Sequence, residues 1–117
     1  MSETTLYDTR GTPRAYIATD GVTIYLWDGE AVAYLVEDKV YAWTGRHIGW
    51  FVQGILFDES GRRCGYVRAR CPVATRVSPV KSVKRVRRVK SVRQVARTRR
   101  AFSAGASGWE LRKFLAQ

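Results

Sequence analysis

The fold of this chain is decided by four related hexapeptides: Leu6–Gly11 (LYDTRG), Ile24–Gly29 (IYLWDG), Val40–Gly45 (VYAWTG) and Leu56–Gly61 (LFDESG). Each begins with an aliphatic and an aromatic residue and ends with glycine. The four glycines recur at intervals of 18, 16 and 16 residues. A repeat of this length is one small supersecondary unit, so the first part of the chain contains four copies of it.

The residues that follow each glycine repeat as well. Four positions after the glycine stands a small residue, followed by an aromatic residue. The small residues are Ala15, Ala33, Gly49 and Gly65, and the aromatic residues are Tyr16, Tyr34, Trp50 and Tyr66. A small residue at one position of every copy indicates a close approach of backbones or rings. We therefore expect the rings to close over the small residues around a shared fourfold axis.

Each copy has the pattern of a β-hairpin. Its strand residues are β-branched or aromatic, and its glycine supplies the positive φ that a tight hairpin turn requires. The sequence thus predicts an all-β fold: four β-hairpin repeats in a meander with pseudo-fourfold symmetry, an extended basic tail and a short C-terminal helix. The strands are expected at residues 4–8, 13–18, 22–27, 31–36, 39–43, 48–52, 55–58 and 63–68. An irregular meander is the alternative.

Charge is distributed unevenly along the chain. Residues 1–71 carry eight Lys/Arg and nine Asp/Glu, a net charge of −1, whereas residues 72–117 carry thirteen and one, a net charge of +12. We therefore expect three parts: a four-hairpin β domain at 1–71, a basic tail at 72–106, and a terminal helical segment at 107–117.

Valine occupies every third position of the tail, with Lys, Arg or Ser at most positions between. The row is Val77, Val80, Val83, Val86, Val89, Val92 and Val95. In an α-helix a three-residue step drifts by about 60°, so these valines would form no apolar face. A conformation with three residues per turn aligns them, either a 3₁₀ helix or polyproline II. Plain disorder is the alternative for a run so rich in like charges.

The last segment has the pattern of a short amphipathic helix. Ser107 and Glu110 fit a capping box, with Ser107 as the N-cap. The residues that then share one helical face are Leu111, Phe114 and Leu115. This pattern predicts a helix at about 108–116. So short a helix is unstable alone and must dock on its own domain or on a partner.

The whole arrangement resembles the small bacterial family known as the 4-fold β flower proteins. The likeness rests on the hairpin copies Ile24–Gly29 and Val40–Gly45, the step Gly49-Trp50-Phe51, the basic three-residue repeat, and the closing Trp109 with Phe114-Leu115. Family tails often carry proline in the triplets, whereas this tail has only Pro72 and Pro79. The resemblance implies an all-β domain of four hairpins and brings no catalytic residue with it.

No residue set has the spacing of a catalytic, metal-binding or cofactor-binding site, so we predict none of these and expect a protein that is not an enzyme. Cys64 and Cys71 lie seven residues apart, which is neither metal nor redox spacing, and Cys64 is expected in the core. His47 follows a predicted hairpin tip, where we expect a solvated loop histidine. Asp8 and Asp58 are expected to accept hydrogen bonds within their own turns.

The sequence also bears on compartment. No stretch approaches the roughly 18 uninterrupted apolar residues of a membrane span. The first ten residues lack the basic start and apolar run of a signal peptide. We therefore expect a cytoplasmic protein, and we infer no small-molecule substrate.

The tail is the feature that suggests a function. Thirteen cations with one acid attract a polyanion, with an affinity that falls as salt rises. The candidates are nucleic acid, an anionic lipid surface and an acidic protein, and the alternative is a basic run that is only solvated. We expect a binding module without strong sequence preference. Its candidate contacts are Lys81, Lys84, Arg85, Arg87, Arg88, Lys90, Arg93, Arg97, Arg99 and Arg100. Trp27 and Trp43 are candidate stacking platforms for bases, or else cross-strand partners within the hairpins.

The alternative is a structural or interaction protein. The three-residue period, which polyanion binding does not need, favours valines that pack into grooves of the β domain or of a neighbouring copy. The terminal helix would then dock on the β domain or complete a homo-oligomer. The candidate docking residues are Val83, Val86, Val89, Trp109, Phe114 and Leu115.

Overall fold

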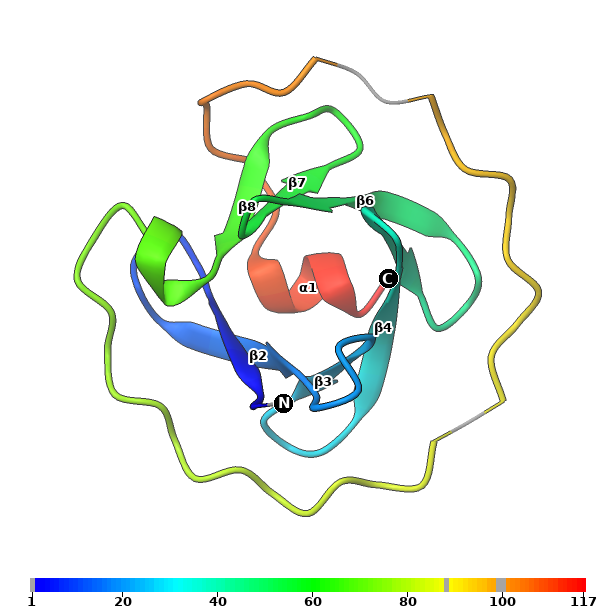
Figure 1. Ribbon diagram of the computed structural model, residues 1–117, viewed down its shortest axis with the longest axis horizontal. Coiled ribbons are helices and arrows are strands. Elements are labelled where there is room, and N and C mark those ends of the chain that lie inside the picture. Colours follow the sequence, from blue (N-terminus) through cyan, green and yellow to red (C-terminus); the bar gives the residue numbers. More distant parts are fainter. Residues whose placement is uncertain (1, 88, 99–100) are drawn as a thin grey trace.

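The computed structural model describes residues 2–87, 89–98 and 101–117 and contains a closed barrel of eight antiparallel strands. The strands are β1 Thr4–Tyr7, β2 Pro13–Ile17, β3 Thr23–Leu26, β4 Ala31–Val36, β5 Lys39–Ala42, β6 His47–Val52, β7 Ile55–Asp58 and β8 Arg63–Tyr66. They follow one another in chain order, and β8 pairs with β1 to close the barrel. The predicted all-β meander is confirmed, with strand ends that differ by at most two residues. We call the hairpins β1–β2, β3–β4, β5–β6 and β7–β8 petals 1 to 4 (Figure 1).

All four petals turn in the same way. In each, the amide of the turn glycine donates to the carbonyl three residues earlier, as from Gly29 to Leu26 at 3.0 Å. The four glycines have φ between 78° and 91°, which other residues rarely adopt. Each petal also has a register shift at the aliphatic–aromatic step of its motif, as between Ile24 and Tyr25. Such bulges increase strand twist, which helps short strands close into a barrel.

Aspartate stabilises the turns of petals 1 and 4, as expected. Asp58 Oδ1 accepts hydrogen bonds from the amides of Ser60 and Arg62, and Asp8 Oδ1 does the same two and four residues along its own turn. Burial by itself would raise the pKa of Asp58, but hydrogen bonds led by those from Ser107 and Ser60 hold the pKa below its usual value. Asp58 is therefore a structural carboxylate.

The interior of the barrel is aliphatic. The leading residues of the four motifs are completely buried there: Leu6, Ile24, Val40 and Leu56. The small residues that follow the turns, here called the small column, are Ala15, Ala33, Gly49 and Gly65. They face inward too, since Ala15 and Ala33 belong to the same core. Cys64 also lies in this core, which confirms its assignment as a small apolar residue. Burial raises the pKa of its thiol well above the usual value.

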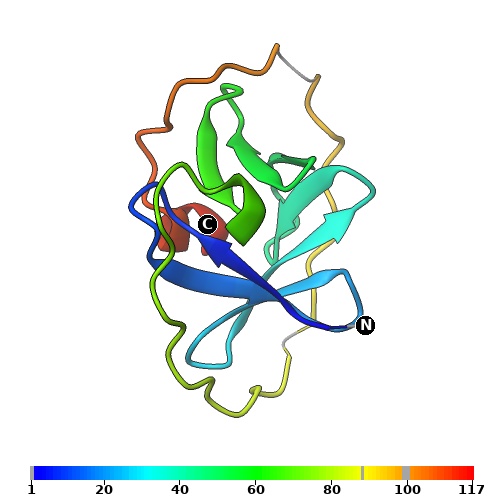
Figure 2. The same cartoon turned by 60° about the vertical axis from the view of Figure 1, so that its left-hand side comes forward.

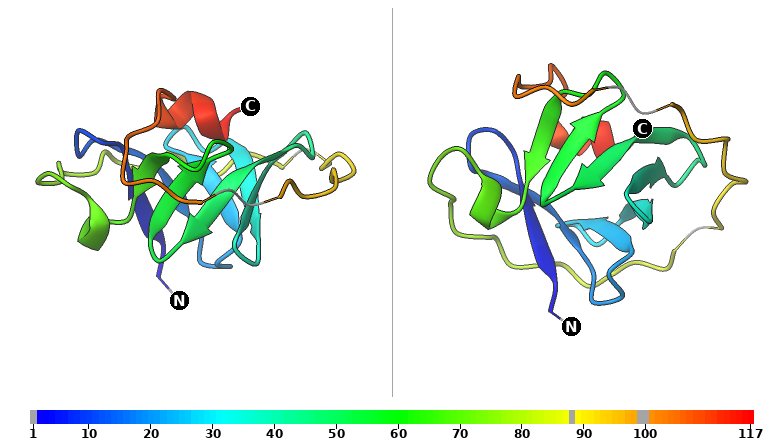
Figure 3. Two further views of the ribbon diagram at one scale, coloured as in Figure 1. Left: turned by 90° about the horizontal axis from the view of Figure 1, so that it is seen from above. Right: turned by 45° about the horizontal axis from the view of Figure 1, so that its top comes forward.

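A short helix, α1 (Leu111–Leu115), plugs one end of the barrel, on the barrel axis (Figures 1 and 3). Its three apolar side chains are buried in the aliphatic core. The small column makes room for them. A Cβ on Gly65 would lie 2.9 Å from Leu111 Cδ1, and a Cβ on Gly49 would lie 2.9 Å from Phe114 Cζ.

The start of α1 differs from the prediction. The helix begins at Leu111 and its N-cap is Glu110, which makes no capping side-chain hydrogen bond. Ser107 lies outside the helix, because its Oγ donates to Asp58 Oδ2 and accepts from the amide of Trp109. The predicted capping box is therefore wrong: Ser107 instead ties the approach to α1 onto petal 4.

The aromatic residues that follow the small column lie on the outer wall of the barrel, not around its axis. Neighbouring residues of a strand point to opposite faces, so an inward Ala15 places Tyr16 outside. The predicted equivalence of the four rings holds, because each of them is at most 4% exposed. Their predicted direction is wrong, and outward rings so well buried require a cover.

The chain after β8 supplies that cover. It forms a 3₁₀ turn, η1 (Arg68–Arg70), and continues into residues 72–103, here called the belt. The described part of the belt runs around the outside of the barrel (Figures 1 and 2). The described part of the belt contains neither strand nor 3₁₀ helix. The molecule is a disc of 37 × 36 × 25 Å. Nine extended residues at about 3.1 Å each span about 28 Å, roughly a quarter of the circumference of such a disc. One petal thus corresponds to nine residues of belt.

Candidate functional site

The belt is fastened to the four petals by backbone hydrogen bonds nine residues apart. The amides of Arg76, Arg85, Gln94 and Ser103 donate over 2.8–2.9 Å to the carbonyls of Gly11, Gly29, Gly45 and Gly61, respectively. Two further amides, those of Ser82 and Ser91, donate to the carbonyls of Trp27 and Trp43. Every donor occupies the same place in the three-residue repeat, directly before the valine position. The same side of the belt therefore faces the barrel at all six of these donors.

The turn glycines are also the points where the belt crosses closest to the barrel. A Cβ on Gly11, Gly29, Gly45 or Gly61 would collide with the carbonyl of Ala74, Val83, Val92 or Ala101, respectively. These four carbonyls again lie nine residues apart. Glycine is thus needed at the turns both for the positive φ and for the contact with the belt.

Several cations that directly follow a valine lie over aromatic rings of the outer wall. Lys81 Nζ lies 4.8 Å from the ring centroid of Tyr16, and Lys90 Nζ lies 4.4 Å from that of Tyr34 in the next petal. A second row lies three residues further along, with Lys84 over Tyr25, Arg93 over Tyr41 and Phe102 over Phe57. Cations over aromatic faces are attracted by about 0.5–1 kcal/mol at exposed sites and by more where they are desolvated.

The two candidate stacking tryptophans are occupied within the fold. The indole nitrogen of Trp27 donates to the carbonyl of Pro13 at 3.0 Å, and its ring packs 5.3 Å from Tyr16. Trp43 meets Tyr34 edge-on at 5.7 Å. Each tryptophan therefore packs against a tyrosine of the preceding petal, so the two are partners between neighbouring hairpins and not within one.

Some belt cations also form ion pairs with the barrel. Lys81 and Lys84 donate to the Glu3 carboxylate at 2.6 and 3.0 Å. These hydrogen bonds, led by that from Lys81, lower the pKa of Glu3, and the bond to Glu3 raises the pKa of Lys84. Arg85 lies 3.9 Å from Asp28, and Arg97 lies 3.5 Å from Glu59.

His47 binds the belt through its side chain, whereas the turn glycines bind it through their backbone carbonyls. The amide of Arg97 donates to His47 Nδ1 at 2.9 Å, and Nε2 lies 2.8 Å from the carbonyl of Gly49. Because Nδ1 accepts, the proton of the neutral ring is on Nε2, which donates to Gly49. The ring is fully buried against Tyr41 and Trp50. The expected solvated loop histidine is therefore wrong.

The valines of the belt point away from the barrel. All seven side chains from Val77 to Val95 are between 91% and 98% exposed. Val83, Val86 and Val89 thus do not pack into grooves of the β domain, and that version of the docking prediction is wrong. The belt docks through the other two positions of its repeat: backbone amides directly before a valine, as at Ser82 and Arg85, and side chains directly after one, as at Lys81.

The remaining candidate residues have mixed positions. Phe114 and Leu115 are buried in the barrel, whereas Trp109 is 42% exposed beside the Phe114 ring. Arg87 donates to Thr23 Oγ1 at 3.2 Å. The last three candidate cations lie outside the described residues: Arg88, Arg99 and Arg100.

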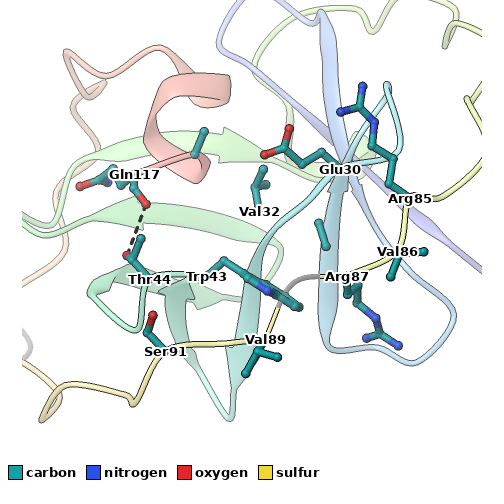
Figure 4. A pocket seen from close by; sticks show the side chains of 12 residues that line it. Glu30, Val32, Trp43, Thr44, Arg85, Val86, Arg87, Val89, Ser91 and Gln117 are labelled. Carbon is teal, nitrogen blue, oxygen red and sulfur yellow. Dashed lines mark hydrogen bonds between the residues drawn. The ribbon is translucent and has the colours of Figure 1, made fainter.

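A pocket of about 340 Å³ lies between the belt and petals 2 and 3 (Figure 4). Glu30, Trp43 and Thr44 line its barrel side, and Arg85 and Arg87 line its belt side. The two arginine side chains point away from each other, so their charges do not converge on the pocket. Within the described ranges, no three His, Cys, Asp or Glu residues gather as metal ligands.

No helix in the described part of the chain has the length and apolar character needed to cross a membrane.

The nine-residue register of the belt escaped the sequence prediction, although a signal for it exists. The tripeptide Lys81-Ser82-Val83 recurs as Lys90-Ser91-Val92, nine residues later. The three-residue period of the valines hides this longer one. Its meaning depends on the circumference of the barrel, which the sequence does not state.

Four bulged hairpins closed into one barrel, an encircling basic chain and a plugging helix define the architecture. The family model of the 4-fold beta flower protein matches residues 4–115, which includes all three features. The chain belongs to the 4-fold beta flower family. The suspected resemblance is thus confirmed, and in this β flower both the belt and α1 lie inside the matched range. No curated protein and no solved structure matches the chain.

Proposed function

We propose that this β flower is a non-enzymatic binding module whose belt binds a polyanion such as nucleic acid, without strong sequence preference. The observation that carries the proposal is that the barrel holds the described cations of the belt, from Arg76 to Arg97, along its rim. The belt loses conformational entropy when the chain folds, so the binding of a ligand costs little further conformational entropy.

The acidic side chains of the barrel offset only part of this charge. Among the described residues, Arg76, Arg87, Lys90 and Arg93 have no acidic side chain within ion-pair distance. The phosphate groups of a nucleic acid attract such cations whatever the base sequence, and binding releases counterions. The expected behaviour is affinity that falls steeply with salt and varies little with sequence.

Binding of a fluorescent single-stranded RNA, measured by anisotropy over a salt series, tests the proposal. The belt variant combines Arg76→Gln, Arg85→Gln and Arg87→Gln, which leave the backbone amide bonds of residues 76 and 85 in place. The control variant combines Arg10→Gln, Arg62→Gln and Arg68→Gln in the β domain. Both variants lower the net charge of +11 by three.

We expect the belt variant to bind more weakly by about tenfold at low salt, with a log–log salt slope reduced by about 2. The control variant should lose much less. Equal losses would mean that net charge, and not the belt, governs binding. No binding of RNA by the wild type at low salt would refute nucleic acid as the polyanion.

Assembly of copies through the belt is the second candidate. The exposure of the valines favours it, and the repulsion between two chains of charge +11 opposes it. Light scattering at rising concentration and high salt, where repulsion is screened, decides: a mass that remains monomeric there excludes self-assembly.

A further inference from the structure

Val77, Val80, Val83, Val86, Val89, Val92 and Val95 form a row around the rim that we call the valine ridge. The side chains of the ridge play no part in holding the belt, because the belt is bound through backbone amides and through the residues that follow the valines. Seven almost fully exposed valines at a regular spacing are unusual on a soluble surface. A surface of this kind marks an interaction site.

Cations flank the ridge on both sides. Figure 4 shows Arg85 and Arg87 pointing in opposite directions from the belt on either side of Val86. Arg87 reaches Thr23 at the start of β3, whereas Arg85 reaches toward Asp28 at the turn after β3, so the two cations extend toward opposite ends of the barrel. Lys84 and Arg97 extend the two rows, toward Glu3 and Glu59. A matching partner has apolar groups along a line and acidic groups on both sides of it.

The curvature of the rim restricts the partner further. The ridge is convex along a disc about 37 Å across, so a flat membrane or a rigid protein face touches only a short arc of it. A second copy is equally convex and carries the same charge. A nucleic acid satisfies the cations and leaves the valines without a partner. A flexible, extended polypeptide can follow the curve, and such segments wrap large surfaces when they bind.

We propose that the valine ridge and its two rows of cations are the docking surface for an extended acidic polypeptide segment that carries apolar side chains. Successive valines are about 9 Å apart along the belt, which leaves room for one apolar side chain between each pair. The inference rests on the proposed function, since the belt cations hold the partner, and it names the chemical class of the polyanion.

Two synthetic 21-residue peptides test the inference on the full-length chain. One repeats the triplet Glu-Leu-Asp and the other repeats Glu-Ser-Asp, so they carry equal charge and differ only in apolar side chains. We expect the wild type to bind the leucine peptide more tightly than the serine peptide by about tenfold or more, as measured by anisotropy. The variant Val83→Ser, Val86→Ser, Val89→Ser should lose most of this preference.

The same variant supplies its own control. Because the three valines are exposed, we expect an unchanged melting temperature and unchanged affinity for the serine peptide. Equal binding of both peptides, or a leucine preference that survives the valine substitutions, overturns the inference. Single-stranded RNA is the third arm. If RNA binds and the leucine preference is absent, the proposed function stands without this inference; if neither RNA nor peptide binds, both fall.

Discussion

A buried histidine holds the belt at petal 3. His47 accepts a hydrogen bond from the amide of Arg97 at Nδ1, so this nitrogen can take no proton while the bond exists. Burial lowers the pKa of His47 below its ordinary 6.5, and the charges of Arg97 and Lys39 lower it further, against the raising effects of Gly49 and Asp38. Folding therefore favours the neutral ring.

We expect acid to weaken the folded state through this residue. A folded-state pKa below the unfolded value means that the stabilisation is complete above about pH 6.5 and is lost as pH falls through the folded pKa. Thermal unfolding of the wild type and of His47→Gln at pH 7.5 and pH 5.5 measures the effect. The wild type should lose more stability than the variant between these values. Equal losses would show that other groups account for the acid sensitivity.

The turn glycines illustrate how much one residue reports. Gly29 was identified from the sequence as a hairpin turn, which its φ of 91° confirms. Its contact with the carbonyl of Val83 could not be predicted, because the two residues lie 54 positions apart and meet only once the barrel has closed. A hexapeptide is long enough to predict a local turn, but it contains no information about a contact with a distant part of the chain.

At the scale of elements, α1 is too short to be stable alone and owes its structure to the barrel. The sequence indicated its apolar face correctly, and it left open whether the face meets the same chain or a partner. The structure places that face in the aliphatic core, in the space that the small column leaves. The helix thus completes the hydrophobic core of the petals.

The burial of α1 in the barrel predicts that truncation of one of its side chains strongly lowers the stability of the fold. Phe114→Ala removes a completely buried ring and should lower the free energy of unfolding by about 3–5 kcal/mol. Lys113→Ala, on the exposed side of the same helix, should change it by no more than about 0.5 kcal/mol. Urea denaturation followed by tryptophan fluorescence compares them. Similar losses in both variants would argue against α1 as part of the core.

At the scale of the whole molecule, the belt and the barrel are matched in length. Hydrogen bonds at Arg76, Arg85, Gln94 and Ser103 place nine residues on each petal. A chain with fewer residues cannot reach all four petals and still return to α1. The circumference of the barrel therefore determines the length of the basic tail, whatever ligand the tail binds.

A deletion tests this matching. Removal of residues 84–86 keeps the three-residue period and shortens the belt by about 9 Å, so the later hydrogen bonds and α1 no longer align. We expect the melting temperature to fall by about 10 °C or more. Replacing the same three residues with serine keeps the length and should lower it by only a few degrees. Equal melting temperatures for the two variants would refute the length argument.

Turn chemistry and strand alternation act over a few residues, so the amino-acid sequence alone determined eight strands, four equivalent hairpins and the separation of a near-neutral domain from a cationic tail. Which side of the wall Tyr16 faces, where His47 finds its partner and which way Val86 points were decided by the closure of the barrel. Closure brings residues far apart in the chain together and divides every strand into an inner and an outer face. The belt then buries the outer face and leaves the valines in solvent, an arrangement that no local pattern contains.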